Sequence, residues 1–199
     1  IDYLGSLQEN YGGSAASGIN DLGNLSGNFS FYSDGSSNKH AFYYSDGKMI
    51  DLGTLGGSWS WARDINNKNL VVGSSHNENE VYRAFQYYSG SMNELNGFYG
   101  LKSYAFATND DDYIVGRYDS GFEIGYEINA ALWFGDSYFD LNDLVEMESN
   151  WHLSVANDIN NLGQIVGYGE FDGQTRGFLL TPNDTAPIPE PSTILLLAV

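Results

Sequence analysis

Three histidines and a run of three aspartates are the side chains whose types could bind a metal ion. The histidines are His40, His76 and His152. They lie far apart in the chain and lack the spacing of metal ligands, so we expect structural roles for them. The aspartates are Asp110, Asp111 and Asp112, and they lack the alternating oxygen ligands of a calcium loop. We predict no cofactor, and calcium binding at the aspartates is the alternative.

No nucleophile or carboxylate pair stands out for catalysis. The chain has no cysteine, which excludes thiol chemistry, disulfides and zinc–thiolate sites. It also lacks the Gly-x-Ser-x-Gly motif of a nucleophile elbow. Acidic residues are abundant, but glycoside hydrolysis depends on the separation of two carboxylates in space, which sequence spacing does not give. We predict that the protein is not an enzyme, and a secreted glycoside hydrolase is one alternative.

Aromatic side chains are unusually frequent, with 15 Tyr, 11 Phe and 4 Trp among 199 residues. Trp59, Trp61 and Trp151 could stack on sugar rings. They come shortly before a repeated alanine, however, and large aromatic side chains bury well between packed layers. We expect them to pack between repeats, and binding of an extracellular polysaccharide is the alternative.

The charge distribution excludes partners that carry many phosphates. The chain has 26 Asp and Glu residues against 8 Lys and Arg, a formal net charge of −18. Its basic residues are spread singly, so a nucleic acid or an anionic lipid surface would be repelled. We predict no nucleic-acid partner.

The elements that position these residues come from an internal repeat. Each copy has an asparagine followed seven positions later by a glycine. The asparagines are Asn20, Asn66, Asn109 and Asn160, separated by 46, 43 and 51 residues, and the glycines are Gly27, Gly73, Gly116 and Gly167. Three residues after each asparagine comes Gly23, Asn69, Asp112 or Gly163, types that accept the left-handed backbone of a hairpin turn. We predict that the asparagine side chain closes the turn.

A short apolar run after each of these turns predicts a strand. The run after the turn, for example Leu70–Val72, is expected to end at the repeat glycine, where the backbone packs closely or bends. A second strand (His40–Tyr44 in the first copy) and a third (Ile50–Gly53) flank the hairpin signal Asp46-Gly47. Four copies of about 45 residues predict one all-β domain over residues 1–181 and a tail over 182–199.

The two ends of the repeat array complement each other. The fourth copy lacks the third strand, and Ile1–Leu7 is an unpaired version of it. If this N-terminal strand completes the last copy, the array closes without exposed sheet edges. We therefore predict a four-bladed β-propeller rather than an open solenoid with capping repeats.

Three segments define the repeat most clearly: His40-Ala41-Phe42, residues 51–58 and residues 156–167. Together they resemble the HAF repeat of bacterial extracellular proteins. In the third copy, Ala130-Ala131-Leu132 stands where the His-Ala-Phe triplet would be expected. The resemblance implies a surface or secreted location and a propeller-like fold, and it carries no catalytic residues.

The C-terminal tail differs in sequence from the repeats. It contains Pro189, Glu190 and Pro191, followed by the apolar residues Ile194, Leu195, Leu196, Leu197 and Val199. This tail resembles the start of the PEP-CTERM sorting signal, which implies processing by an exosortase at the surface of a Gram-negative-type bacterium. Its apolar stretch has six residues, whereas a membrane span needs ~20, so we expect no span in it.

These observations lead to one functional hypothesis. The first residues read as strand and turn, which favours a mature secreted chain. We expect the tail to dock as a strand or apolar plug on a neighbouring copy, giving head-to-tail oligomers or filaments; packing on its own domain is the alternative. The predicted function is a non-catalytic structural protein of a bacterial extracellular matrix or cell surface, with polysaccharide binding and glycoside hydrolysis as the alternatives.

Overall fold

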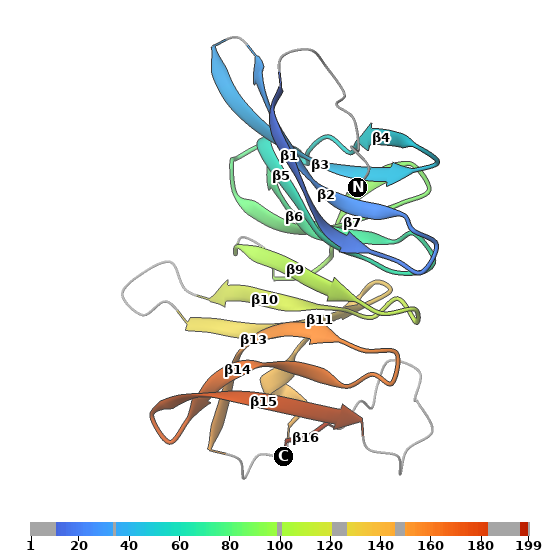
Figure 1. Ribbon diagram of the computed structural model, residues 1–199. Coiled ribbons are helices and arrows are strands. Elements are labelled where there is room, and N and C mark those ends of the chain that lie inside the picture. The colour runs from blue at the N-terminus through green and yellow to red at the C-terminus, as the bar shows by residue number, and fades with distance from the viewer. Residues whose placement is uncertain are drawn as a thin grey trace. The chain divides into compact units, whose positions relative to one another are not determined.

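The computed structural model describes residues 11–33, 35–98, 101–120, 127–145, 150–182 and 196–198. In these residues the regular elements are β-strands, apart from one 3-10 helix of three residues. The chain divides into two units, residues 1–95 and 96–199, and each holds two of the repeats. The prediction of an all-β protein is confirmed (Figure 1).

The first unit contains two antiparallel meanders of four strands each. Their strands are β1 (Tyr11–Ile19), β2 (Leu25–Ser33), β3 (Ser36–Ser45) and β4 (Lys48–Asp51), then β5 (Gly56–Ile65), β6 (Val71–Asn77), β7 (Tyr82–Tyr88) and β8 (Ser91–Glu94). Within each meander, neighbours in sequence pair with each other. One parallel pair, Lys39 with Trp59, joins the meanders into an eight-stranded sheet. We call these meanders the first and second repeats.

The second unit contains the third and fourth repeats as two separate four-stranded sheets. Their elements are β9 (Ser103–Thr108), β10 (Ile114–Ser120), β11 (Glu127–Phe134), β12 (Ser137–Asp140) and the 3-10 helix η1 (Leu141–Asp143), then β13 (Trp151–Ile159), β14 (Ile165–Phe171), β15 (Gln174–Pro182) and β16 (Leu196–Ala198). The first three strands of the fourth repeat form a meander, and β16 reaches it from the C-terminal tail.

The hairpin between β3 and β4 follows its sequence signal. Asp46 and Gly47 have φ of 51° and 74°, and Ser89 and Gly90 in the equivalent hairpin of the second repeat have 53° and 88°. Two successive left-handed residues are the geometry of a type I′ turn, which suits the twist of the two strands it connects.

The repeat glycines lie in the middle of strands, so the prediction that the strand ends at them is wrong. The reason for a glycine is a close approach from the neighbouring strand. A Cβ on Gly167 would lie 1.9 Å from the carbonyl oxygen of Val155 and 2.5 Å from the ring of Phe178. Next to this contact, β13 carries a bulge between Ala156 and Asp158. Equivalent bulges lie opposite the other three repeat glycines.

The pairing register corrects the alignment of the third repeat. Gly27, Gly73 and Gly167 pair with Phe42, Phe85 and Phe178. Gly116 pairs with Ala131, so Ala131 rather than Leu132 takes the place of the phenylalanine. The triplet of the third repeat is therefore Asn129-Ala130-Ala131.

Each unit has its own apolar core, which lies between its two repeats. In the first unit, Ala41 and Leu52 of the first repeat pack with Ile65, Val71 and Phe85 of the second. In the second unit, the third repeat contributes Val115, Ala130 and Leu132, and the fourth contributes Ile159, Ile165 and Phe178. The two cores use equivalent positions, so one packing rule joins repeat to repeat in both units.

The strand beside β15 comes from the C-terminal tail. Leu180 pairs with Ala198, and Pro182 pairs with Leu196. The sequence predicts Ile1–Leu7 beside the last repeat, and these residues lie outside the described ones, so that placement stays a prediction; among the described strands it is β16 that pairs with β15. The strand pairings give three open sheets, and closure into a four-bladed ring stays a prediction.

Candidate functional site

The repeated asparagines occupy the same position in four turns. The Oδ1 atom of Asn66 accepts hydrogen bonds from the backbone N–H groups of Lys68 and Leu70, both at 3.0 Å. The side chains of the other three asparagines make the same two bonds in their own turns. The residue three positions later is left-handed in every case, with φ of 77° at Gly23, 64° at Asn69, 64° at Asp112 and 73° at Gly163. Each turn is thus closed by its own asparagine.

The same asparagines also join one repeat to the next. In the first unit, Nδ2 of Asn20 donates to the carbonyl oxygen of Asn66 at 3.0 Å. In the second unit, Nδ2 of Asn109 donates to the carbonyl oxygen of Asn160 at 3.1 Å. One side chain therefore satisfies its own turn and the turn of the following repeat.

The residue after each asparagine adds a second pair of bonds. The backbone N–H of Asp21 donates to Oδ1 of Asn67, and Nδ2 of Asn67 donates back to the Asp21 carboxylate, both at 2.8 Å. Asp110 and Asn161 make the same reciprocal pair, both at 2.9 Å. We call these turn-to-turn bonds, with those of the asparagines, the turn ladder.

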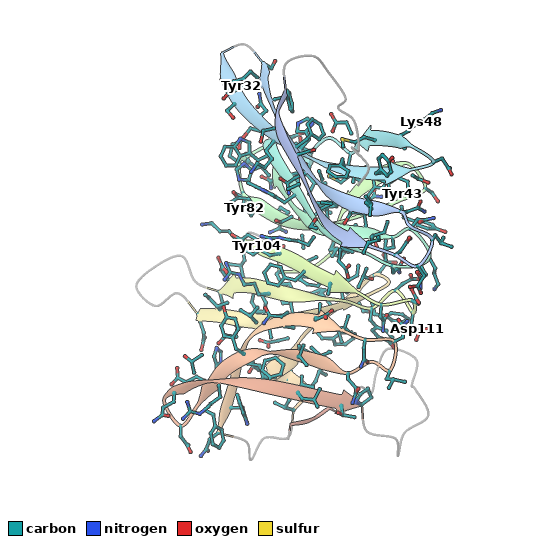
Figure 2. The ribbon with its side chains drawn as sticks, in the orientation of Figure 1. Tyr32, Tyr43, Lys48, Tyr82, Tyr104 and Asp111 are labelled. Atoms are coloured by element: carbon teal, nitrogen blue, oxygen red, sulfur yellow. The ribbon has the colours of Figure 1, made fainter. Side chains whose placement is uncertain are left out.

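The three consecutive aspartates lie in this ladder. Asp110 bonds to Asn161, the backbone N–H of Asp111 donates to Oδ1 of Asn109, and Asp112 takes the left-handed position. Figure 2 labels Asp111 at the turn. Within the part of the chain that the structure describes, no group of three acidic or histidine side chains is arranged to hold a metal ion.

A pairing of polar side chains across the third and fourth strands was missed by the sequence reasoning. Nδ1 of His40 lies 2.9 Å from the Asp51 carboxylate, and Nε of Arg83 lies 2.6 Å from that of Glu94. Both pairs are eleven residues apart, and this constant separation is the signal that could have found them. The equivalent carboxylate of the third repeat, Asp140, accepts a hydrogen bond from the Tyr118 hydroxyl at 2.8 Å.

The Tyr118 hydroxyl is held firmly in its protonated form. Burial is the largest cause, and the hydrogen bond to Asp140 adds to it; together they raise the pKa of Tyr118 well above its ordinary value. The group is therefore a fixed hydrogen-bond donor over the whole physiological pH range.

An aromatic cluster lies on the second repeat and consists of Trp59, Trp61, His76 and Tyr82. Trp59 is 37% exposed, its ring centroid is 5.3 Å from that of Trp61, and it stacks on His76 with an interplanar angle of 3°. Tyr82 meets His76 edge-on at 4.1 Å. The rings pack mainly on one another, with the Trp59 indole at the surface. The third candidate, Trp151, is half-buried and packs against Phe171 and Phe178.

A carboxylate adjoins this cluster. Glu80 accepts a hydrogen bond from the Ser58 hydroxyl at 2.8 Å and lies 2.6 Å from Nδ1 of His76. The bond from Ser58 and the proximity of His76 lower the pKa of Glu80. The aromatic cluster is thus bordered by a negative charge.

The first unit also has a shallow depression of about 360 Å³. It is lined by Tyr43, Ile50, Lys68, Asn69, Tyr87, Tyr88, Ser89 and Gly90. Figure 2 shows Tyr43 and Tyr82 at separate places on this unit, so the depression and the aromatic cluster are distinct features.

The three histidines stand apart from one another. His40 and His76 each meet one carboxylate, as described above, and Nε2 of His152 lies 3.1 Å from the carbonyl oxygen of Ile128. Each histidine therefore has a local partner of its own.

The predicted tail residues are only partly described. Leu196 and Leu197 belong to β16 and pair through their backbone with Pro182 and Thr181. Pro189, Glu190, Pro191, Ile194, Leu195 and Val199 lie outside the described residues. Over the ranges that are described, no helix combines the length and the apolar character needed to cross a membrane.

Comparison of the chain with known proteins gave no match. It matches no protein-family model, no curated protein and no solved structure. The resemblances to the HAF repeat and to the PEP-CTERM signal stay predictions from the residues that carry them.

Proposed function

We propose that this chain is a secreted, non-catalytic structural protein of a bacterial extracellular matrix or cell surface, and that copies of it associate head to tail through the C-terminal tail. The pairing of β16 with β15 is the observation that supports this best. The other repeats take their fourth strand from their own meander, whereas the fourth repeat takes it from the tail. Strand addition relies on main-chain hydrogen bonds, so the β15 edge of another copy offers the tail the same partner.

The use of polar side chains agrees with a structural role. The asparagine and aspartate side chains of the turns bond to the next repeat. The pairs His40–Asp51 and Arg83–Glu94 each bridge two strands within their own meander. These groups hold the array together and are spread along it. The extracellular location rests on the resemblance of the tail to the PEP-CTERM signal.

Removal of residues 186–199 tests this proposal. Light scattering and negative-stain microscopy of the full chain and of the truncated chain are compared at equal concentration, with circular dichroism as the check that both are folded. Oligomers or filaments that disappear on truncation support the proposal. Monomers in both samples would overturn it.

The predicted four-bladed ring is an intramolecular alternative to growth by head-to-tail contacts. In a ring, the fourth repeat meets the first repeat of the same chain, and the sheet edges are protected by closure. A monodisperse monomer with the small radius of a closed ring in small-angle X-ray scattering would favour this alternative.

Polysaccharide binding is the second candidate, and the exposed indole of Trp59 favours it. This ring lies at the surface of the aromatic cluster, with the Glu80 carboxylate at its border. Affinity electrophoresis in gels that contain bacterial exopolysaccharide tests it. Retardation that is lost in Trp59→Ala and kept in Trp151→Ala would support binding at this cluster, and equal mobility of all three proteins would count against it.

A further inference from the structure

Successive repeats within each unit pack by opposite faces. We name the two faces after residues of the second unit. The valine face of the third repeat carries Val115 and Leu132, which are 0% and 2% exposed. It packs against the isoleucine face of the fourth repeat, which carries Ile159 and Ile165. In the first unit, the isoleucine face of the second repeat, with Ile65 at 3% exposure, packs in the same way against the first repeat.

The valine face of the fourth repeat is exposed. Val166 pairs with Leu179 as Val115 pairs with Leu132, so the two pairs are equivalent. Val166 is 43% exposed and Leu179 is 39% exposed. Tyr168, two residues beyond Val166 on the same side of β14, is 41% exposed. Three side chains thus lie open on this face, whereas in the preceding repeat the counterparts of Val166 and Leu179 are buried.

The isoleucine face of the first repeat is open at Ile19, the equivalent of the buried Ile65 and Ile159. Ile19 is 69% exposed, whereas its counterparts Ile65 and Ile159 are 3% and 7% exposed. Ala16 is also exposed, while its counterparts in the second and fourth repeats are buried. Two larger side chains on this face, Phe29 and Phe42, are buried, with exposures of 2% and 0%. The first and fourth repeats therefore expose complementary faces, each the partner of the other in the packing rule.

The turn ladder shows the same complementarity through an independent set of atoms. Nδ2 of Asn160 bonds to Oε1 of Gln164 in its own turn at 2.9 Å, and Asn160 is exposed. The asparagines of the first and third repeats use this amide to reach the carbonyl oxygen of the following repeat. The carbonyl oxygen of Asn20, the first in the array, accepts the turn bond from Gly23. A carbonyl oxygen can accept two hydrogen bonds. The carbonyl oxygen of Asn66 does so, from the backbone N–H of Asn69 in its own turn and from the Asn20 amide of the preceding repeat.

We propose that the valine face of the fourth repeat binds the isoleucine face of the first repeat in a second copy of this chain. Val166, Tyr168 and Leu179 of one copy cover Ile19 of the next, and the Asn160 amide turns from Gln164 to the Asn20 carbonyl of that copy. The two faces are different surfaces, so the contact is heterologous and leaves a free face at each end for further copies. This inference rests on the self-assembly in the proposed function, and it adds to the tail a second contact, between the repeat faces, without which copies do not associate.

The net charge of the chain gives this assembly a characteristic response to salt. Each copy carries −18, so copies repel one another at long range while the contact itself is apolar. Screening at 0.5 M salt shortens the range of this repulsion to a few ångströms. Assembly of the wild-type chain is expected to become stronger with salt.

Two charge substitutions, one on each face, provide the test. Ile19→Asp places a charge on the isoleucine face of the first repeat, and Val166→Asp places one on the valine face of the fourth. Ile50→Asp on β4 is the control, because Ile50 is also an exposed isoleucine, at 41%. Each protein is studied by analytical ultracentrifugation in 0.5 M salt, alone and in the equimolar mixture of Ile19→Asp with Val166→Asp. All three variants are expected to keep the melting temperature of the monomer, because the replaced side chains are exposed.

Wild type and Ile50→Asp are expected to form oligomers. Ile19→Asp and Val166→Asp are expected to stay monomeric up to about 100-fold higher concentration, because a carboxylate is costly to bury in an apolar contact. The mixture is expected to form dimers and nothing larger, because one intact face remains on each protein. Dimers in the mixture would be specific to a contact between two different faces.

Other outcomes overturn the inference in distinguishable ways. Oligomers that persist in both face variants and disappear on removal of residues 186–199 would leave the proposed function standing and move the contact to the tail. A wild-type monomer whose melting temperature is lowered by Ile19→Asp and by Val166→Asp would show that the faces meet within one chain. A wild-type monomer without that effect would refute both the face contact and the self-assembly in the proposed function.

Discussion

Gly167→Ala is the substitution for which the structure makes its sharpest prediction. The added Cβ would lie 1.9 Å from the carbonyl oxygen of Val155 and 2.5 Å from the Phe178 ring. The carbonyl belongs to the backbone of β13 next to its bulge, so it has no rotamer with which to move away. The ring belongs to the core of the second unit. Either β13 or Phe178 must shift, and both shifts open the contact between the third and fourth repeats.

The size of the effect follows from two opposing contributions. Inserting a methyl group into a tightly packed site costs up to about 3 kcal/mol when the surroundings cannot relax. Replacing glycine with alanine restricts the unfolded chain and returns ~0.5 kcal/mol. The net loss in the free energy of unfolding is roughly 2.5 kcal/mol, which lowers the melting temperature of a chain of this size by roughly 5–10 °C.

A matched control lies in the neighbouring strand. A Cβ on Gly177 would meet only the carbonyl oxygen of Gly167, at 3.7 Å, which is ordinary contact. Gly177→Ala is therefore expected to leave the melting temperature unchanged or raise it by ~1–2 °C. Thermal unfolding followed by circular dichroism, with urea unfolding as the second measurement, compares the two variants. If Gly167→Ala melts within about 2 °C of Gly177→Ala, the reasoning from the close approach is refuted.

Three further predictions concern the side-chain bonds. Asn109→Ala removes two turn bonds and the bond to Asn160, and should lower the free energy of unfolding in urea by about 2–3 kcal/mol. Asn160→Ala removes turn bonds at an exposed site and should lower it by about 1 kcal/mol. Equal losses would mean that the turn ladder contributes nothing to stability. Glu94→Gln removes the charge of the carboxylate that faces Arg83, a side chain that is 4% exposed, and should cost about 1–3 kcal/mol at pH 7. Glu170→Gln is the exposed control, and a loss no larger than that of the control would show that the pair is not stabilising. Because its pKa is lowered in the folded state, Glu80 stabilises the fold above its ordinary pKa of 4.5, and this stability is lost as the pH falls through the folded pKa. Ser58→Ala should move the pKa of Glu80 back toward 4.5 in an NMR titration. An unchanged pKa would show that the bond from Ser58 is not the main cause of the shift.

Much of the local structure could be predicted from the residues because its causes lie within a few positions. Asn66 and Asn69 are three residues apart, and the closure of the turn between them needs only a side-chain acceptor and a left-handed residue. The hairpin at Asp46-Gly47 has the same local origin. The repeat glycines could be recognised as sites of close approach, but not as mid-strand positions. Their close contact is with a bulge on another strand, which no pattern around the glycine itself reveals.

The candidate surfaces depended on contacts over long distances in the sequence. The pair Arg83–Glu94 required the register of β7 and β8, and the exposure of Val166 required the packing of whole repeats.

The amino-acid sequence by itself determined the all-β class, the four repeats and the turns that end their first strands, because these follow from side-chain type and spacing along one short segment. Tertiary structure alone decided that β16 pairs with β15, that Ala131 pairs with Gly116, and that Ile19 and Val166 are left exposed. The physical reason is that a sheet edge or an apolar face accepts any segment of suitable shape that can reach it. The choice among segments is made by packing and by hydrogen bonds between residues distant in the chain.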